Sequence, residues 1–157
     1  MATKEFIRST DIFKELSDAE LDKVVALAKE ETHKKGEFII KEREPSTKFY
    51  VVESGVIEIG RNSQINSKFI KLARLERGEV FGELSIFENG VNSASALVVL
   101  APESKVISWE SGKMRELLLH EPLLANKIMN NLLRKFSTRL KLASEAIYTL
   151  TNILEKP

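Results

Sequence analysis

The sequence predicts an α+β fold that is mainly β, in which short strands form a sandwich or barrel between helical segments at both ends of the chain. Two observations support this prediction. The spacing of apolar residues changes from helical to strand-like near residue 37 and returns to helical near residue 110. Between these points, short runs of β-branched and aromatic residues alternate with turns rich in Gly, Pro and Ser, which is typical of sandwiches and barrels.

Length and composition indicate one globular domain and exclude several functions. The chain has 157 residues, of which 43% are hydrophobic and 30% charged, with a formal net charge of +1. This charge gives no global attraction to nucleic acid or to an anionic membrane, so we expect neither partner. The absence of cysteine excludes disulfides, thiolate metal sites and cysteine nucleophiles. No apolar run approaches the roughly 20 residues that span a bilayer, and the polar N-terminus is unlike a signal peptide. We expect a cytoplasmic protein.

The N-terminal part, residues 6–36, is predicted to be helical. Ser17, followed three residues later by Glu20, forms a capping-box pattern before apolar residues at helical spacing. Gly36 comes directly after two lysines, and basic residues followed by glycine are typical of a helix end. We therefore place the end of this helical part at Gly36.

The middle part, residues 37–110, is predicted to consist of strands separated by turns. Their aromatic side chains are interpreted as core residues rather than as a stacking surface for a cofactor. The β-rich runs are Phe38–Ile40, Phe49–Val52, Val56–Ile59, Lys68–Leu72, Ala96–Leu100 and Lys105–Trp109.

The C-terminal part, residues 111–155, is predicted to form two helices. Ser111 is expected to cap the first, which runs to Leu119, and Pro122 lies at an early position of the second. No Pro or Gly follows as far as Glu155. The second helix carries an apolar stripe with the spacing of a coiled coil: Met129, Leu133, Phe136, Leu140, Ala143, Ile147, Leu150 and Leu154. A second apolar row lies beside the stripe. Either one wide face packs on the chain's own domain, or one face packs there and the stripe forms a homodimer, which we favour.

The most specific segment is residues 75–90, LERGEVFGELSIFENG. It resembles the phosphate-binding cassette of cyclic-nucleotide-binding domains, the family of the bacterial catabolite activator proteins and of the regulatory subunits of cyclic-AMP-dependent kinase. Further signatures of that family occur in the same order along the chain, from Leu16 to Leu154. They are the opening helix at Leu16–Leu21, the first strand at Lys35–Ile40, the strand–turn–strand at Tyr50–Ile57 and the dimer helix at Arg139–Glu145.

The resemblance implies an antiparallel β-roll (a double-stranded β-helix or jelly roll) with N-terminal helices and a long C-terminal dimer helix. It implies one domain over residues 1–157, with the cassette at 78–95. The ligand-binding positions that it implies are Gly82, Glu83, Leu84, Asn92, Ser93, Ala94 and Ser144. Glu83 would either accept a bond from a ribose hydroxyl or cap the backbone amides of the cassette. Asn92 and Ser93 would contact a neutral polar ligand or form a solvated loop, and Ser144 would contact the base or be merely exposed.

The sequence departs from the family pattern at the phosphate contact. The family's arginine, which binds the cyclic phosphate in bidentate fashion, should fall at Asn92 or Ser93, and neither is cationic. No Lys or Arg occurs between Arg77 and Lys105. A basic residue on the preceding strand, Lys71 or Arg74, is one conceivable replacement. We expect binding of a cyclic nucleotide to be weakened severely, and we predict no resident cofactor.

Three functions follow from these observations, and none is enzymatic, because no catalytic or phosphate-loop motif is present. The favoured one is a non-catalytic regulatory module with a degenerate nucleotide pocket, which acts through dimerisation and a protein partner. The second is a working sensor of cyclic AMP or cyclic GMP with a non-standard phosphate contact. The third is a purely structural dimeric docking protein. No metal is expected, since His33 and His120 lack ligand spacing.

Overall fold

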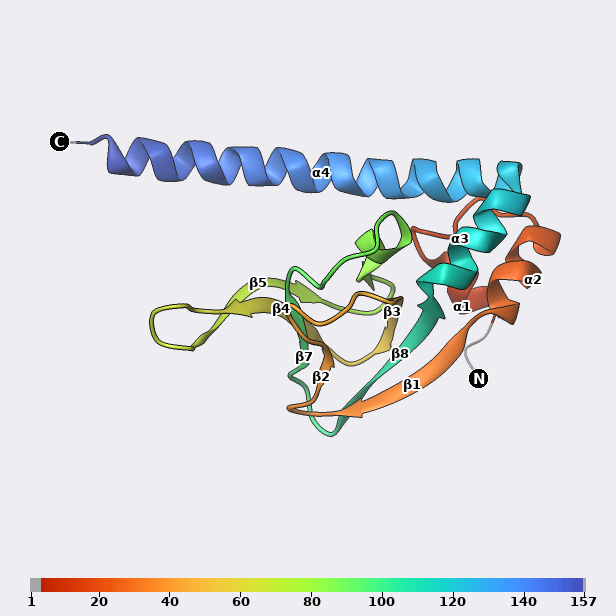
Figure 1. The fold of residues 1–157 in the computed structure, drawn as a ribbon, viewed down its shortest axis with the longest axis horizontal. Coiled ribbons are helices and arrows are strands. Elements are labelled where there is room, and N and C mark those ends of the chain that lie inside the picture. Colours follow the sequence, from red (N-terminus) through yellow and green to blue (C-terminus); the bar gives the residue numbers. More distant parts are fainter. Residues whose placement is uncertain (1–3, 157) are drawn as a thin grey trace.

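The computed structural model describes residues 4–156, which form two antiparallel sheets with short helices at one end and a long helix along one side (Figure 1). The first four-stranded sheet has the order β1 (Lys29–Lys34), β8 (Glu103–Glu110), β3 (Lys48–Ser54) and β6 (Val80–Phe81). The second has the order β2 (Phe38–Ile40), β7 (Ser95–Val98), β4 (Ile57–Asn62) and β5 (Phe69–Leu75). The predicted α+β roll is therefore confirmed.

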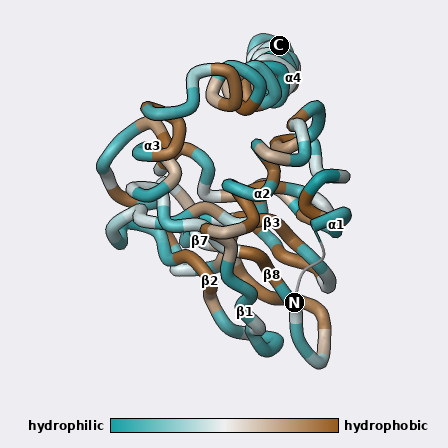
Figure 2. The backbone as a smooth tube through the Cα atoms, turned by 90° about the vertical axis from the view of Figure 1, so that its right-hand side faces the viewer, coloured by the Kyte–Doolittle hydropathy of each residue, from teal (hydrophilic) through white to brown (hydrophobic). Residues whose placement is uncertain are grey.

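Strand β3 divides the apolar interior into two cores, because successive side chains point to opposite faces of a strand. Tyr50 and Val52 face the interior of the roll, between the two sheets. Phe49 and Val51 face the helices. Trp109 of β8 stacks on Phe49, with 5.1 Å between the ring centroids. Figure 2 shows these hydrophobic segments of β3 and β8 beside the N-terminal helices.

The N-terminal helices are shorter than predicted. They are α1 (Lys4–Ser9) and α2 (Asp18–Ala26). The capping box is confirmed: the backbone N–H of Ser17 donates to Glu20 Oε2 at 2.7 Å, and that of Glu20 donates to Ser17 Oγ at 3.3 Å.

The prediction that the helical part continues to Gly36 is wrong. Residues 29–34 form β1, an edge strand that pairs antiparallel with β8. Its sequence, KEETHK, contains no apolar residue, and it is identified as a strand only by its backbone pairing with β8. Gly36 does not end a helix. It adopts a φ of +89° in the turn between β1 and β2, a conformation that favours glycine.

The two C-terminal helices are α3 (Ser111–His120) and α4 (Pro122–Leu154), with Pro122 at the start of α4 as predicted. The predicted cap at Ser111 is wrong. Glu110 is the N-cap residue without a side-chain bond, and the hydroxyl of Ser111 instead shares a hydrogen bond with that of Ser85. This bond ties α3 to the cassette.

Helix α4 contributes fully buried residues to the domain over its first three turns only. Leu124, Ile128 and Leu132 are buried in the core that also holds Trp109, whereas residues 137–155 are exposed. The helix runs along the molecule and its C-terminal end extends past the roll (Figure 1). None of the helices in residues 4–156 is long and apolar enough to cross a membrane.

Candidate ligand pocket

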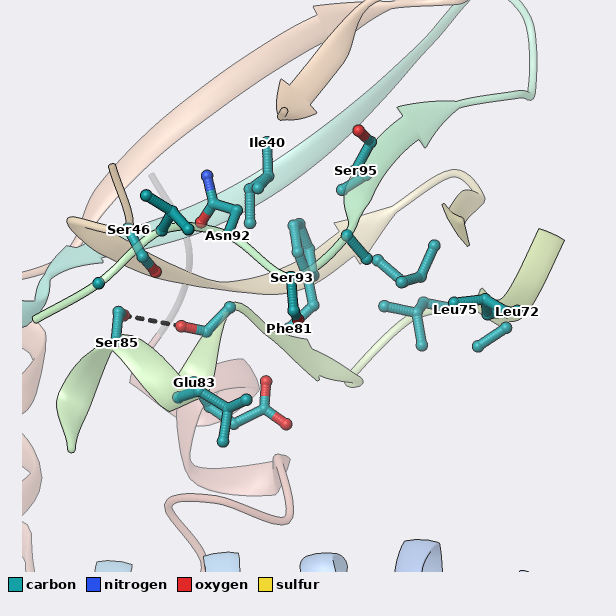
Figure 3. A pocket seen from close by; sticks show the side chains of 18 of the residues that line it. Ile40, Ser46, Leu72, Leu75, Phe81, Glu83, Ser85, Asn92, Ser93 and Ser95 are labelled. Carbon is teal, nitrogen blue, oxygen red and sulfur yellow. Dashed lines mark hydrogen bonds between the residues drawn. The ribbon is translucent and has the colours of Figure 1, made fainter. Parts of the chain in front are cut away.

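A cavity of about 440 Å³ lies between the second sheet, the cassette and helix α4 (Figure 3). Most of its lining side chains are apolar. The lining includes six of the seven predicted ligand-binding residues: Gly82, Glu83, Leu84, Asn92, Ser93 and Ala94.

Within the cassette, one residue has a backbone conformation that favours glycine. Gly82 has a φ of +73°, and a Cβ there would lie 3.0 Å from the carbonyl oxygen of Lys48. The following residues, Glu83–Ile86, form a single turn of 3₁₀ helix, η1. The hydroxyl of Ser85 donates to the Gly82 carbonyl at 2.7 Å, as drawn in Figure 3, and fixes this turn. Gly82 is therefore accounted for by the fold itself.

The polar centre of the pocket is an ion pair between Glu83 and Arg139. The Glu83 side chain is only 4% exposed, and Arg139 Nη1 donates to its Oε1. Arg139 comes from α4, and its side chain is 46% exposed. The predicted partners of Glu83 were a ligand hydroxyl or the backbone amides of the cassette. In the structure its partner is a guanidinium that the sequence did not lead us to expect.

Two further contacts hold α4 against the cassette. Lys135, one helical turn before Arg139, donates from Nζ to the Val80 carbonyl at 3.3 Å. Burial of the Lys135 ammonium, with Arg139 nearby, lowers its pKa from the usual value. The ring of Phe136 meets that of Phe87 edge-on, with 5.9 Å between centroids. The helix thus approaches the pocket with two basic groups and one aromatic ring.

The opposite wall carries Asn92 and Ser93, the two positions at which the sequence resemblance led us to expect the family's arginine. Asn92 Nδ2 donates to the carbonyl of Lys41 at 3.0 Å, so this amide is partly used in fixing the neighbouring loop. Neither Lys71 nor Arg74 lines the cavity, and Arg74 Nε lies 3.9 Å from Glu76 Oε1 instead. Among the described residues that line the cavity, Arg139 is the single cation.

Ser144, the seventh predicted contact, does not line the cavity. It lies on the exposed C-terminal half of α4, where Leu142 rather than Ser144 contributes to the lining. The spacing along a helix explains the difference. Arg139 and Leu142 are three residues apart and lie on one face, whereas Ser144 is five residues from Arg139 and faces away.

Comparisons with known proteins identify the class of protein to which this fold and pocket belong. The sequence profile of the cyclic nucleotide-binding domain family matches residues 30–121. The chain therefore belongs to that family, as the cassette and the wider pattern predicted.

Two individual relatives are a protein kinase and a transcriptional regulator. The chain is 27% identical to human cGMP-dependent protein kinase 2 over 103 residues, which is 66% of this chain and 13% of the kinase. It is 25% identical to the CRP-like cAMP-activated global transcriptional regulator of Mycobacterium tuberculosis over 115 residues, 73% of this chain and 50% of the regulator. The chain thus spans half or less of these relatives.

A solved structure gives the same result for the fold. The crystal structure of the Thermus thermophilus catabolite activator protein matches with a TM-score of 0.76 and 25% identity, over 90% of this chain and 63% of that one.

Proposed function

We propose that this chain is a non-catalytic regulatory domain whose pocket lacks the standard phosphate contact, and that it acts through a homodimer and a protein partner. The observation that carries the proposal is the Glu83–Arg139 pair. In this pair Glu83 binds Arg139, the single cation among the described residues that line the cavity. Asn92 and Ser93 offer only an amide and a hydroxyl to a phosphate.

The charges around the pocket support this reading. A cyclic phosphate would face Glu83 and Glu88, with Arg139 already bound to the first of them. Leaving a charge without its partner in a buried site costs roughly 3–5 kcal/mol, which corresponds to roughly two to three and a half decades in affinity. A micromolar site would become a millimolar one.

A second candidate is a working cyclic-nucleotide sensor in which Arg139 binds the phosphate. The observation in its favour is that the guanidinium lines the cavity and is about half exposed. In this case Arg139 would exchange Glu83 for the ligand or bind both. The two candidates differ in whether the wild-type protein binds a cyclic nucleotide tightly and in whether that binding depends on Arg139.

The experiment titrates the wild type, Ser93→Arg and Arg139→Gln with cyclic AMP and with cyclic GMP. Calorimetry measures the dissociation constant, and the melting temperature is recorded at each ligand concentration. We expect wild-type and Arg139→Gln proteins to bind no tighter than millimolar. Ser93→Arg should tighten binding by about a hundredfold or more, because it supplies the missing cation. At 100 times its dissociation constant, a ligand should then raise the melting temperature by roughly 5–10 °C.

Ser137→Arg, which adds the same charge on the exposed part of α4, is the matched control. Its affinity for cyclic nucleotides should equal that of the wild type. Micromolar binding by the wild type that Arg139→Gln abolishes would overturn the proposal in favour of the second candidate. Failure of Ser93→Arg to improve binding would show that the pocket's weakness has another cause.

The output of the domain is part of the same proposal. Beyond Phe136, the apolar stripe of α4 has no partner among the described residues that buries it, and a second α4 is the surface that the coiled-coil spacing fits. A purely structural docking protein would use the same stripe. It would differ in being insensitive to every substitution in the pocket, including one at Glu83 or Asn92.

A further inference from the structure

The wall of the cavity is chiefly apolar and part of it is open to solvent. Ile40, Ile59, Leu75 and Phe81 form its floor between the sheets. At its rim Leu72, Leu84 and Val91 are exposed apolar side chains. Concave surfaces of this kind, with an apolar lining and a few polar groups, are the usual form of a small-molecule site. A ligand with an apolar body would cover the rim as well as the floor.

The charged groups of the lining disfavour an anion. They are one cation, Arg139, and two carboxylates, Glu83 and Glu88, so their formal charges sum to −1 (+1 − 2). Arg139 and Glu83 satisfy each other, and Glu88 is exposed near the mouth. An anionic ligand would have to break the pair or remain unpaired, whereas an uncharged ligand leaves the pair intact.

The remaining polar groups suit a neutral ligand. The hydroxyls of Ser46 and Ser93 and the Oδ1 atom of Asn92 line the cavity without a side-chain hydrogen bond to another residue within 4–156. Figure 3 shows Ser46, Asn92 and Ser93 on the wall opposite Glu83. Hydroxyl and amide groups donate to or accept from a ligand without requiring it to carry charge.

We propose that this pocket takes an uncharged ligand with an apolar, ring-sized body and one or two hydroxyl, aromatic amine or amide groups. This inference rests on the proposed function, since it assigns a ligand class to a pocket without the standard phosphate contact. It differs from that proposal in predicting a positive binding preference rather than the absence of one.

The test compares two fluorescent dyes that share one ring framework. N-phenylnaphthylamine is neutral, and anilinonaphthalene sulfonate is the same molecule with a sulfonate group. Titrated into the wild-type protein, the neutral dye should bind saturably and at least about tenfold more tightly than the anionic one, a difference that one unpaired charge readily exceeds. In Ser93→Arg the preference for the neutral dye over the anionic one should shrink or reverse.

The dyes must be shown to bind in the pocket, because α4 also exposes apolar side chains. Ala94→Trp fills the cavity from a half-buried loop position. It should weaken binding of the neutral dye at least about tenfold, because the dye loses the apolar surface that it would bury in the cavity. Leu142→Gln, at an exposed lining position, serves the same purpose if Ala94→Trp does not fold. Tyr148→Ser, at an exposed position of α4 outside both the cavity and the stripe, is the control and should leave binding of the neutral dye unchanged.

Equal or tighter binding of the sulfonate dye by the wild type would overturn the inference. So would failure of the neutral dye to bind, or binding that the pocket variants leave intact. These outcomes are separate from those of the nucleotide titration. Tight wild-type binding of cyclic AMP would end the proposed function whatever the dyes do, and a preference for the sulfonate would end this inference even if cyclic AMP does not bind.

Discussion

Glu31 of the edge strand β1 joins three polar side chains from strands β1, β3 and β8 of the first sheet. Its Oε1 atom accepts from the hydroxyl of Ser108 at 2.6 Å and from Lys48 Nζ at 2.9 Å, and its Oε2 atom lies 3.2 Å from His33 Nε2. Burial opposes ionisation of Glu31, but these hydrogen bonds outweigh it, so the pKa of its carboxyl group lies below the ordinary value. Burial of the Tyr50 hydroxyl, with the charge of Glu31 nearby, raises the pKa of Tyr50 to about 12.

The lowered pKa of Glu31 makes its contribution to stability depend on pH. Because the folded-state pKa lies below the unfolded one, the ionised carboxylate stabilises the fold above the unfolded pKa of about 4.5, and this stabilisation is lost as the pH falls through the folded value. We expect Glu31→Gln to lower the free energy of unfolding by about 1–2 kcal/mol at neutral pH.

Urea denaturation between pH 7 and pH 3 measures this effect. The difference between wild type and Glu31→Gln should shrink steadily below about pH 4.5, the ordinary pKa of a glutamate. Glu145→Gln, on the exposed part of α4, is the matched control. A difference that stays constant over the whole range would mean that Glu31 acts through packing rather than through its charge.

The pocket shows how far single residues can be predicted. The cassette pattern predicted three residues that line the pocket, Gly82, Glu83 and Asn92. They are close together in the sequence, and each position in the pattern calls for a particular backbone or side-chain property. Arg139 was missed because it is 56 residues from Glu83, and its proximity depends on the packing of α4. The available signal was Lys135 and Arg139 one turn apart, beside the apolar row that packs on the domain.

At the scale of elements, local chemistry decided which predictions succeeded. The start of α2 at Ser17 was predictable because a capping box is a property of four consecutive residues. The strands β1 and β6 were not predicted. The first is polar throughout, and the second has two residues, so both are defined by their neighbours in the sheet rather than by a period of their own.

Helix α4 is one element with two different surroundings, and its two halves should respond differently to truncation. Leu132→Ala should lower the free energy of unfolding by about 2–5 kcal/mol, because Leu132 is buried in the core that also holds Trp109 and its truncation leaves a cavity. Leu150→Ala should change it by no more than about 0.5 kcal/mol when the protein is monomeric, because Leu150 contacts solvent.

Urea denaturation at a protein concentration where sedimentation shows monomer separates the two halves. The same substitution at both positions makes each variant the control of the other. If Leu150→Ala were as destabilising as Leu132→Ala in the monomer, the C-terminal half of α4 would have to pack on its own roll in solution.

At the scale of the whole molecule, the roll and its helices were predictable because family signatures occur in the right order from Leu16 to Leu154. Their order specifies most of the strands and helices, with β1 and β6 as the exceptions. The arrangement of α4 over the cassette then follows from the buried residues of its first turns and from the contacts of Lys135, Phe136 and Arg139. The assembly of two chains was predicted from the same signatures and stays a prediction, since the structure of a single chain does not show what covers the exposed face of α4.

The proposed homodimer is a prediction about this remaining surface. Five residues of the stripe, Leu133, Leu140, Ile147, Leu150 and Leu154, are between 60% and 84% exposed. They recur at coiled-coil spacing over the part of α4 that leaves the domain, and two such stripes would bury each other. We expect sedimentation to show a dimer at micromolar concentration.

The double variant Leu140→Asp and Ile147→Asp should be monomeric, because four carboxylates would meet in the seam of the dimer and lose their hydration without a cationic partner. Thr138→Asp with Asn152→Asp places the same charge on the opposite side of the helix and should remain dimeric. If the wild type is monomeric, a different protein would have to cover the stripe, and the homodimer would no longer be part of the proposed function. A dimer that persists in Leu140→Asp with Ile147→Asp would place the interface elsewhere, and the exposed edge of β5 with Ile70 and Leu72 would then be the next surface to mutate.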